Sequence, residues 1–280
     1  MVEFEEKREK WNTTRIEPMA DRSFQLVKAM HGAIERGELH MVYQPKINPF
    51  KHQVVGMEAL VRWFHPVYGE IPPEQFIPLA ERTRYIIPMG EWVLRSACSQ
   101  LKIWHQAGHP QLHIAVNLSV CQLQAEGFVE FVSQILQELD LRPHFLQFEV
   151  TESTDIYYNQ EGINRLHELK RLGVQIYMDD FGIGYSALSC LQRMPVDGIK
   201  INRVLTSQME KESVYQLMKA MIQLARGLRL KVVVEGVESP EKMAALKKWR
   251  VDEVQGYLSR VPIPAHELIF KLGQMGGEVG

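Results

Sequence analysis

The stretch that decides the fold is LHMVYQPKINPFKHQVVGMEALVRW, residues 39–63. It contains two apolar, partly β-branched runs, 39–47 and 54–63, separated by the turn-like NPFKHQ. So short a connection predicts a hairpin of two antiparallel strands with no helix between them. Six further strand-like runs follow along the chain, at 113–119, 146–152, 174–180, 198–202, 231–237 and 253–258.

Amphipathic helical stretches lie between most of these runs, at 93–108, 128–139, 213–228 and 239–249, and another helix is expected from Asp21 to Gly37. Alternating β and α units favour a parallel sheet. Eight strands in 280 residues favour an α/β fold of the modified (β/α)8 TIM-barrel type, with one antiparallel strand, over an open doubly wound sheet. Residues 1–20 are polar and predict a tail or linker, and 21–280 form the barrel domain. No GxGxxG or GxxxxGK[ST] phosphate loop is present.

The composition is that of a soluble globular protein, with 45% hydrophobic and 24% charged residues. The net charge of −2 supplies no basic field for duplex nucleic acid or an anionic membrane, so an anionic ligand would need a local site. Cys98, Cys121 and Cys190 are widely spaced, which predicts a reducing cytoplasm rather than a disulfide framework. The charged N-terminus has no signal-peptide pattern, and no apolar run approaches the ~20 residues of a membrane helix.

Polar side chains close the apolar runs at seven strand ends. A single such residue is usually a solvated strand end, but seven together point to one barrel mouth, where barrel enzymes place their active sites. The residues are Glu58, Asn117, Glu149, Asp179 with Asp180, Lys200, Glu235 and Gln255.

Five of these residues are carboxylates, which would repel one another in a concave mouth unless cations neutralised them. A ligand set made of oxygens suits Mg²⁺ or Mn²⁺ rather than zinc. The adjacent Asp179 and Asp180 can serve two ions, and a paired-metal site is a recurring device for phosphodiester hydrolysis.

The chain resembles the EAL family of bacterial cyclic di-GMP phosphodiesterases from about Leu39 to Leu272. The signature is Glu58-Ala59-Leu60, and seven ordered motifs accompany it: YQP at 43–45, NLS at 117–119, EVTE at 149–152, DDFGIGYS at 179–186, KIN at 200–202, EGVE at 235–238 and QGYL at 255–258. The resemblance implies a modified (β/α)8 barrel that hydrolyses cyclic di-GMP to linear pGpG with Mg²⁺ or Mn²⁺. It also implies a homodimer in the bacterial cytoplasm and an upstream sensory or GGDEF domain in a longer parent protein.

Carried over by motif, the resemblance assigns roles to individual residues. It implies a first metal held by Glu58, Asn117, Glu149 and Asp179, with Asp179 bridging to a second ion on Asp180. Lys200 would orient the attacking water, and Glu235 is the further essential acid. Gln44, Leu60 and Arg62 match positions that contact the dinucleotide, Gln255 closes the site, and Glu152 anchors the loop after Asp180.

Three motifs depart from the family pattern. Ile183 replaces a threonine, Asn202 replaces an aspartate near Lys200, and Ser259-Arg260 replaces Phe-Ser. None is an expected metal ligand, so we expect activity to be retained. Two other hypotheses stay open: a receptor that binds cyclic di-GMP without cleaving it, and a degenerate domain that acts through protein contacts.

Overall fold

The computed structural model describes residues 19–151, 159–183, 187–256 and 262–268. The expected tail lies outside these ranges up to residue 18, as do Glu152, Ser259 and Arg260. The first helix, α2, begins at Met19, two residues before the predicted start at Asp21.

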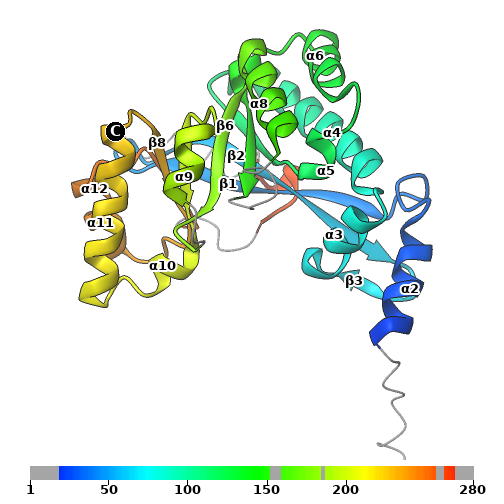
Figure 1. Cartoon of the computed structure of the whole chain (residues 1–280), viewed down its shortest axis with the longest axis horizontal. Helices are drawn as coiled ribbons and strands as arrows, with labels where there is room; N and C mark the ends of the chain where they lie inside the picture. Colours follow the sequence, from blue (N-terminus) through cyan, green and yellow to red (C-terminus); the bar gives the residue numbers. More distant parts are fainter. Residues whose placement is uncertain (1–18, 152–158, 184–186, 257–261, 269–280) are drawn as a thin grey trace, which may run out of the picture.

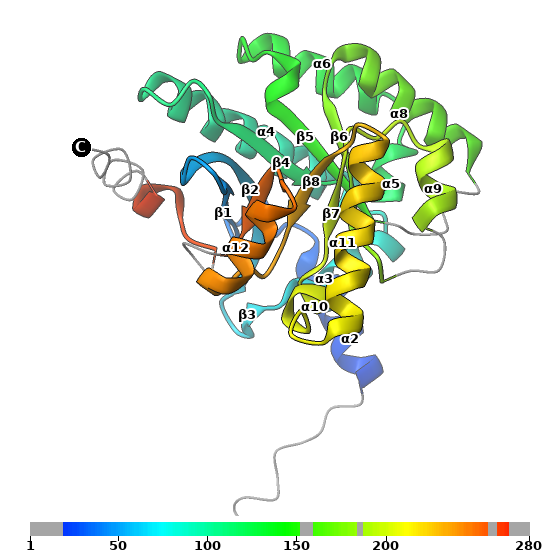
Figure 2. The ribbon, with the colours of Figure 1, turned by 90° about the vertical axis from the view of Figure 1, so that its left-hand side faces the viewer.

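The strands form a closed barrel, shown in Figures 1 and 2. Neighbours in the sheet run in the order β1-β9-β8-β7-β6-β5-β4-β2-β3, and an additional pairing of β1 with β2 closes the ring. All eight predicted strands are present, and the predicted barrel is confirmed. The strands are β1 Leu39–Asn48, β2 Gln53–His65, β3 Gly69–Ile71, β4 His113–Asn117, β5 Leu146–Thr151, β6 Gln175–Phe181, β7 Gly198–Ile201, β8 Lys231–Val234 and β9 Glu253–Gln255.

The antiparallel strand of the barrel is β1. It pairs antiparallel with β2 on one side and with β9 on the other, whereas the pairs from β2–β4 around to β8–β9 are parallel. This confirms the predicted hairpin. The short strand β3 extends β2 outside the ring and was not predicted, because three residues carry no readable periodicity.

Helices cover the outside of the barrel, with α11 and α12 on the opposite side of the molecule from α2 (Figure 1). The amphipathic stretch predicted at 93–108 lies mostly in α4, where Leu101 and Trp104 are buried. Ser239 caps α12 by accepting from the Lys242 N–H. The helices are α2 Met19–Met30, α3 Pro73–Arg82, α4 Ile86–Gln106, α5 Val120–Leu123, α6 Phe128–Glu138, η1 Pro143–Phe145, α8 Gln160–Leu172, α9 Ala187–Arg193, α10 Arg203–Ser207, α11 Glu212–Gly227 and α12 Pro240–Lys248.

The predicted C-terminal end of the first helix was wrong. The helix expected to reach Gly37 ends at Met30, and turns follow over residues 31–37. The reason is Gly32, whose φ of +82° lies in the left-handed region and terminates the helix.

A bulge in β6 places the acid pair. Met178 pairs with Ile199 and Phe181 with Ile201, so Asp179 and Asp180 stand opposite the single residue Lys200. Asp180 adopts a left-handed φ of +57°. In a regular strand two successive side chains point to opposite faces, but the extra residue of a bulge re-aims one of them. Both carboxylates can therefore serve the same end of the barrel.

Candidate active site

The predicted site residues meet inside the barrel at its mouth. Lys200 on β7 contacts Glu58 on β2, although these strands are not neighbours in the sheet. Such a contact has to cross the barrel interior. Glu149 on β5 and Glu235, directly after β8, reach the same point. The convergence that the sequence predicted from separate strand ends is present in the described residues.

Lys200 is the centre of this cluster, and its side chain is 1% exposed. Four carboxylates surround this ammonium, and Glu149 also pairs with Lys46, so two negative charges stay uncompensated when all four acids are ionised. The Nζ atom lies 2.9 Å from Glu58 Oε2, 2.8 Å from Glu149 Oε2, 3.6 Å from Asp179 Oδ2 and 2.8 Å from Glu235 Oε1.

The ionisation of the cluster follows from burial and charge. Burial alone lowers the pKa of Lys200, but the surrounding carboxylates raise it well above its ordinary value. Burial raises the pKa of Asp179, and the neighbouring Glu149, Glu58 and Glu235 raise it further against the opposing effect of Lys200. The contributions of the carboxylates raise both pKa values, because the mouth holds more negative charge than Lys200 neutralises.

Glu58 is held directly by amides from two other strands. Asn117 Nδ2 donates to Glu58 Oε1 at 3.0 Å, and Gln255 Nε2 donates to Glu58 Oε2 at 2.6 Å. Gln255 Nε2 also donates to Gln44 Oε1 at 2.6 Å. Gln44, which resemblance assigned to the substrate, and Gln255 thus form one chain of hydrogen bonds that fixes the Glu58 carboxylate.

Asp180 is tied to the loop after β7 through Asn202. Asn202 Nδ2 donates to Asp180 Oδ1, and Asn202 Oδ1 accepts from the Val204 N–H at 2.7 Å, which caps α10. The two bonds fix which end of the amide faces Asp180. An aspartate at position 202 could cap the helix equally well but could not donate to Asp180 when ionised.

The turn after the bulge carries Ile183. Its N–H donates to the Asp180 carbonyl at 3.3 Å, and its side chain is 52% exposed. Among the described residues nothing explains why an isoleucine stands there. Glu152, the expected anchor of this loop, lies outside the described residues.

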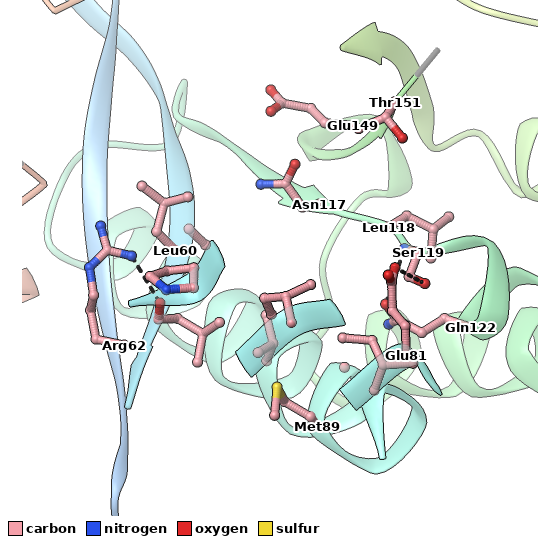
Figure 3. Close-up of a pocket in the computed structure, with 17 residues that line it drawn as sticks. Leu60, Arg62, Glu81, Met89, Asn117, Leu118, Ser119, Gln122, Glu149 and Thr151 are labelled. Atoms are coloured by element: carbon pink, nitrogen blue, oxygen red, sulfur yellow. Dashed lines mark hydrogen bonds between the residues drawn. The ribbon is translucent and has the colours of Figure 1, made fainter. Parts of the chain in front are cut away.

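A cavity of about 310 Å³ opens beside the carboxylates (Figure 3). Leu60 and Arg62 line it from β2, on the same strand face as Glu58. Asn117 and Glu149 line it on the side of the acid cluster. Apolar side chains of α3 and α4, such as Ile77 and Met89, form another wall. The cavity therefore joins an apolar slot to the charged mouth.

The far part of the cavity contains polar groups that the sequence did not single out. Ser119 Oγ donates to Glu81 Oε1 at 2.8 Å, and both residues line the cavity. Glu81 lies in helix α3, where an acidic residue is common, so the sequence pattern gave no reason to predict a role for it in the site. Ser119 belongs to the NLS motif, and its side chain also caps α5.

The donor set fits divalent cations by chemistry and by charge. Within the described ranges, no three His, Cys, Asp or Glu side chains are by themselves arranged around an ion, because the Lys200 ammonium stands between the carboxylates. The candidate ligands carry oxygen donors, and the cluster has an excess of negative charge. Gln255 Oε1 is in addition buried with no described hydrogen-bond partner. Oxygen donors around excess negative charge are what Mg²⁺ and Mn²⁺ prefer.

The sequence model of the EAL domain matches residues 27–262, which is most of the chain. The chain belongs to the EAL domain family. The resemblance inferred from Glu58-Ala59-Leu60 and the ordered motifs is thereby confirmed.

Named relatives and solved structures share this EAL domain. The chain is 40% identical over 251 residues to MucR of Pseudomonas aeruginosa, a bifunctional diguanylate cyclase/cyclic di-GMP phosphodiesterase, covering 89% of this chain and 37% of MucR. It is 39% identical over 234 residues to the cyclic di-GMP phosphodiesterase PdeR of Escherichia coli, covering 83% of this chain and 35% of PdeR. A solved complex of the PaMucR phosphodiesterase with c-di-GMP has a TM-score of 0.81 and 40% identity, covering 87% of this chain and 99% of that one.

The chain spans about a third of the length of these curated relatives. None of the helices in the described part of this EAL domain has the length and apolar character that crossing a bilayer requires.

Proposed function

We propose that this EAL domain hydrolyses one phosphodiester bond of cyclic di-GMP to give linear pGpG, with the help of divalent cations. The observation that carries the proposal is the convergence of four carboxylates on the single Lys200 ammonium, beside a cavity that Arg62 lines. Family membership and relatives named as cyclic di-GMP phosphodiesterases support the same substrate.

The cations would be held at the mouth by the oxygen donors of Glu58, Asn117, Glu149, Asp179 and Asp180. Bound there, two divalent ions would supply an activated water and offset the charge that develops on the phosphate oxygens. The amides of Gln255 and Asn117 keep the Glu58 carboxylate in one orientation. The bulge of β6 brings Asp180 to the same end of the barrel as Asp179.

Lys200 and Glu235 handle the proton of the attacking water in this proposal. The Glu235 side chain is 20% exposed, compared with 12% or less for the three other carboxylates around Lys200. It is therefore the acid best placed to accept a proton at Oε and pass it to solvent. Lys200 donates hydrogen bonds from Nζ and favours a deprotonated nucleophile beside it.

The substrate would lie along β2 and into the cavity. The Arg62 guanidinium offers forked donors to a phosphate oxygen. The apolar wall that contains Ile77 and Met89 suits the face of a purine. At the far part of the cavity, the Glu81 carboxylate is an acceptor for the N–H groups of a guanine edge.

The direct test is product analysis after incubation of the protein with cyclic di-GMP and Mg²⁺ or Mn²⁺. We expect pGpG from the wild type. Asp179→Asn should reduce turnover by at least about 1000-fold, because it removes one charge from a bridging ligand. Cyclic di-GMP that binds tightly without product at high enzyme concentration would contradict hydrolysis and favour the receptor function. Wild-type rates in Asp179→Asn would contradict the assignment of the metal ligands.

We also propose that residues 21–280 form the barrel domain and that 1–20 link it to an upstream sensory or GGDEF domain. The greater length of the relatives supports this view. A homodimer is the proposed assembly, and exposed leucines along one face of α11, Leu217 and Leu224, offer an apolar surface for it. Sedimentation velocity decides between monomer and dimer.

A further inference from the structure

A second lysine lies deeper in the barrel. The Lys46 side chain is fully buried, and its Nζ atom lies 2.5 Å from Glu149 Oε1 and 3.2 Å from Gln147 Oε1. Its ammonium also stands over the ring of Tyr177, 5.8 Å from the centroid. Strands β1 and β5 are not neighbours in the sheet, so the contact from Lys46 to Glu149 crosses the barrel interior.

The two oxygens of Glu149 are divided between two lysines. Oε1 pairs with Lys46, and Oε2 accepts from Lys200 at 2.8 Å. The Glu149 side chain is fully buried, so its rotation is restricted by the groups around it. Since Lys46 holds Oε1 from the interior side, Oε2 is the oxygen that faces the mouth.

The placement of Lys46 is tied to β1. Gln44 and Lys46 lie two residues apart and share a strand face. Gln44 accepts from the amide that holds Glu58, and Lys46 holds Glu149. Strand β1, the one antiparallel strand of the barrel, therefore supports two acids from other strands. Lys46 holds Glu149 directly, and Gln44 reaches Glu58 through Gln255.

Stability is a weak reason for Lys46 to be charged. Replacing a buried ion pair by apolar residues is often neutral or stabilising, whereas removing one partner leaves an uncompensated charge. Lys46 is also absent from the lining of the cavity, which Glu149 reaches, so it does not meet the substrate. What its geometry does control is the orientation of Glu149.

We propose that Lys46 is the positioning residue for Glu149: it holds Oε1 from inside the barrel, so that Glu149 presents Oε2 to a divalent cation at the mouth. This proposal rests on the proposed function, because it takes Glu149 as a metal ligand. Groups that orient a metal ligand from behind typically change metal affinity by about 10- to 100-fold when they are removed.

The test is a titration of the metal-free protein with Mn²⁺, followed by the loss of the free-ion electron paramagnetic resonance signal. Lys46→Met keeps an unbranched side chain of similar length without charge, and we expect its Mn²⁺ dissociation constant to rise by about 10- to 100-fold. Tyr177→Phe is the matched control: it removes a buried hydroxyl from the ring that faces the Lys46 ammonium but keeps both lysines that hold Glu149, so it should bind Mn²⁺ as the wild type does. The KM for cyclic di-GMP at saturating Mn²⁺ should stay unchanged in Lys46→Met.

Each outcome of this titration decides something. Folded Lys46→Met that binds Mn²⁺ within about twofold of the wild type overturns the positioning role, because a merely structural role lowers the melting temperature and leaves the affinity of the folded protein unchanged. If Lys46→Met does not fold, Lys46→Leu, which also lacks an N–H donor, decides by the same criterion. A wild type that binds no Mn²⁺ overturns the proposed function and this inference together, whereas a wild type that binds Mn²⁺ and a Lys46→Met variant of unchanged affinity overturn only the inference.

Discussion

Two buried lysines hold the two oxygens of Glu149, and they stand in opposite charge environments. Lys46 pairs with that one carboxylate and an uncharged amide, Gln147. Lys200 shares its charge among four carboxylates from different strands. The barrel interior is therefore balanced, while the mouth has an excess of negative charge. Additional cations therefore belong at the mouth, and replacing the two lysines should change the affinity for cations in opposite directions.

The largest expected effect comes from removing the shared lysine. Lys200→Met leaves the four acids without their ammonium, which should destabilise the metal-free fold by about 3–5 kcal/mol. The variant should bind Mn²⁺ at least about tenfold more tightly than the wild type, because the competing ammonium is gone. Turnover should nevertheless fall by about 10²- to 10⁴-fold, since no group orients the water.

Chemical denaturation with and without Mn²⁺ measures the change in stability, and the metal titration measures the change in Mn²⁺ affinity. Lys46→Met is the counterpart, and its affinity should change in the opposite direction. Weaker Mn²⁺ binding in both variants would break the comparison between a balanced interior and an acidic mouth.

Another buried acid, Glu253, lies on the balanced, interior side of this comparison. Its Oε2 lies 3.3 Å from His113 Nε2. Burial raises the pKa of Glu253, but His113, Lys46 and Lys231 outweigh it and lower the pKa to about 2. Because the folded pKa lies below the unfolded value, this acid stabilises the fold above about pH 4.5, and the contribution is lost as the pH falls towards 2.

Glu253→Gln should therefore lack this pH dependence. The difference in unfolding free energy between the wild type and the variant should shrink by roughly 3 kcal/mol between pH 4.5 and 2. Urea denaturation at a series of pH values measures it. A difference that stays constant across this range would show that Glu253 is not held ionised in the fold.

The smallest expected effect concerns Asn202, which bonds Asp180 at the acidic mouth. Asn202→Asp keeps the helix cap on the Val204 N–H but replaces the donor to Asp180 by a second carboxylate. The added charge should tighten Mn²⁺ binding by about 1 kcal/mol, roughly fivefold, and lower metal-free stability by a similar amount. Asn202→Ala, which loses the bond without adding charge, is the control. Equal Mn²⁺ affinities in the wild type and Asn202→Asp would show that charge at this position does not reach the metal site.

Much of the architecture follows from local pattern. The short turn between residues 47 and 54 required an antiparallel pair, and the apolar runs closed by acids marked the strands and their mouth. Glu58, Glu149, Asp179 and Glu235 could be grouped because parallel strands end at one side of a barrel. Family motifs then supplied roles that pattern alone leaves open.

Other features depend on contacts that no local pattern encodes. The bulge at Asp179–Asp180 arises from a left-handed backbone at an aspartate, whereas two adjacent acids in a strand would ordinarily face apart. Lys46 occupies an alternating position in which a solvent-facing lysine is just as consistent with the sequence. Its partner Glu149 is about a hundred residues away, so the pair becomes visible once the barrel closes.

The most direct test of the acidic mouth is the rate of pGpG formation from cyclic di-GMP as a function of free Mn²⁺ in the wild type. We expect no product in EDTA, a rate that rises to saturation with Mn²⁺, and a half-saturating Mn²⁺ concentration that matches the dissociation constant from direct metal binding. Product formation that continues unchanged in EDTA, or cyclic di-GMP that stays intact at saturating Mn²⁺, would contradict it.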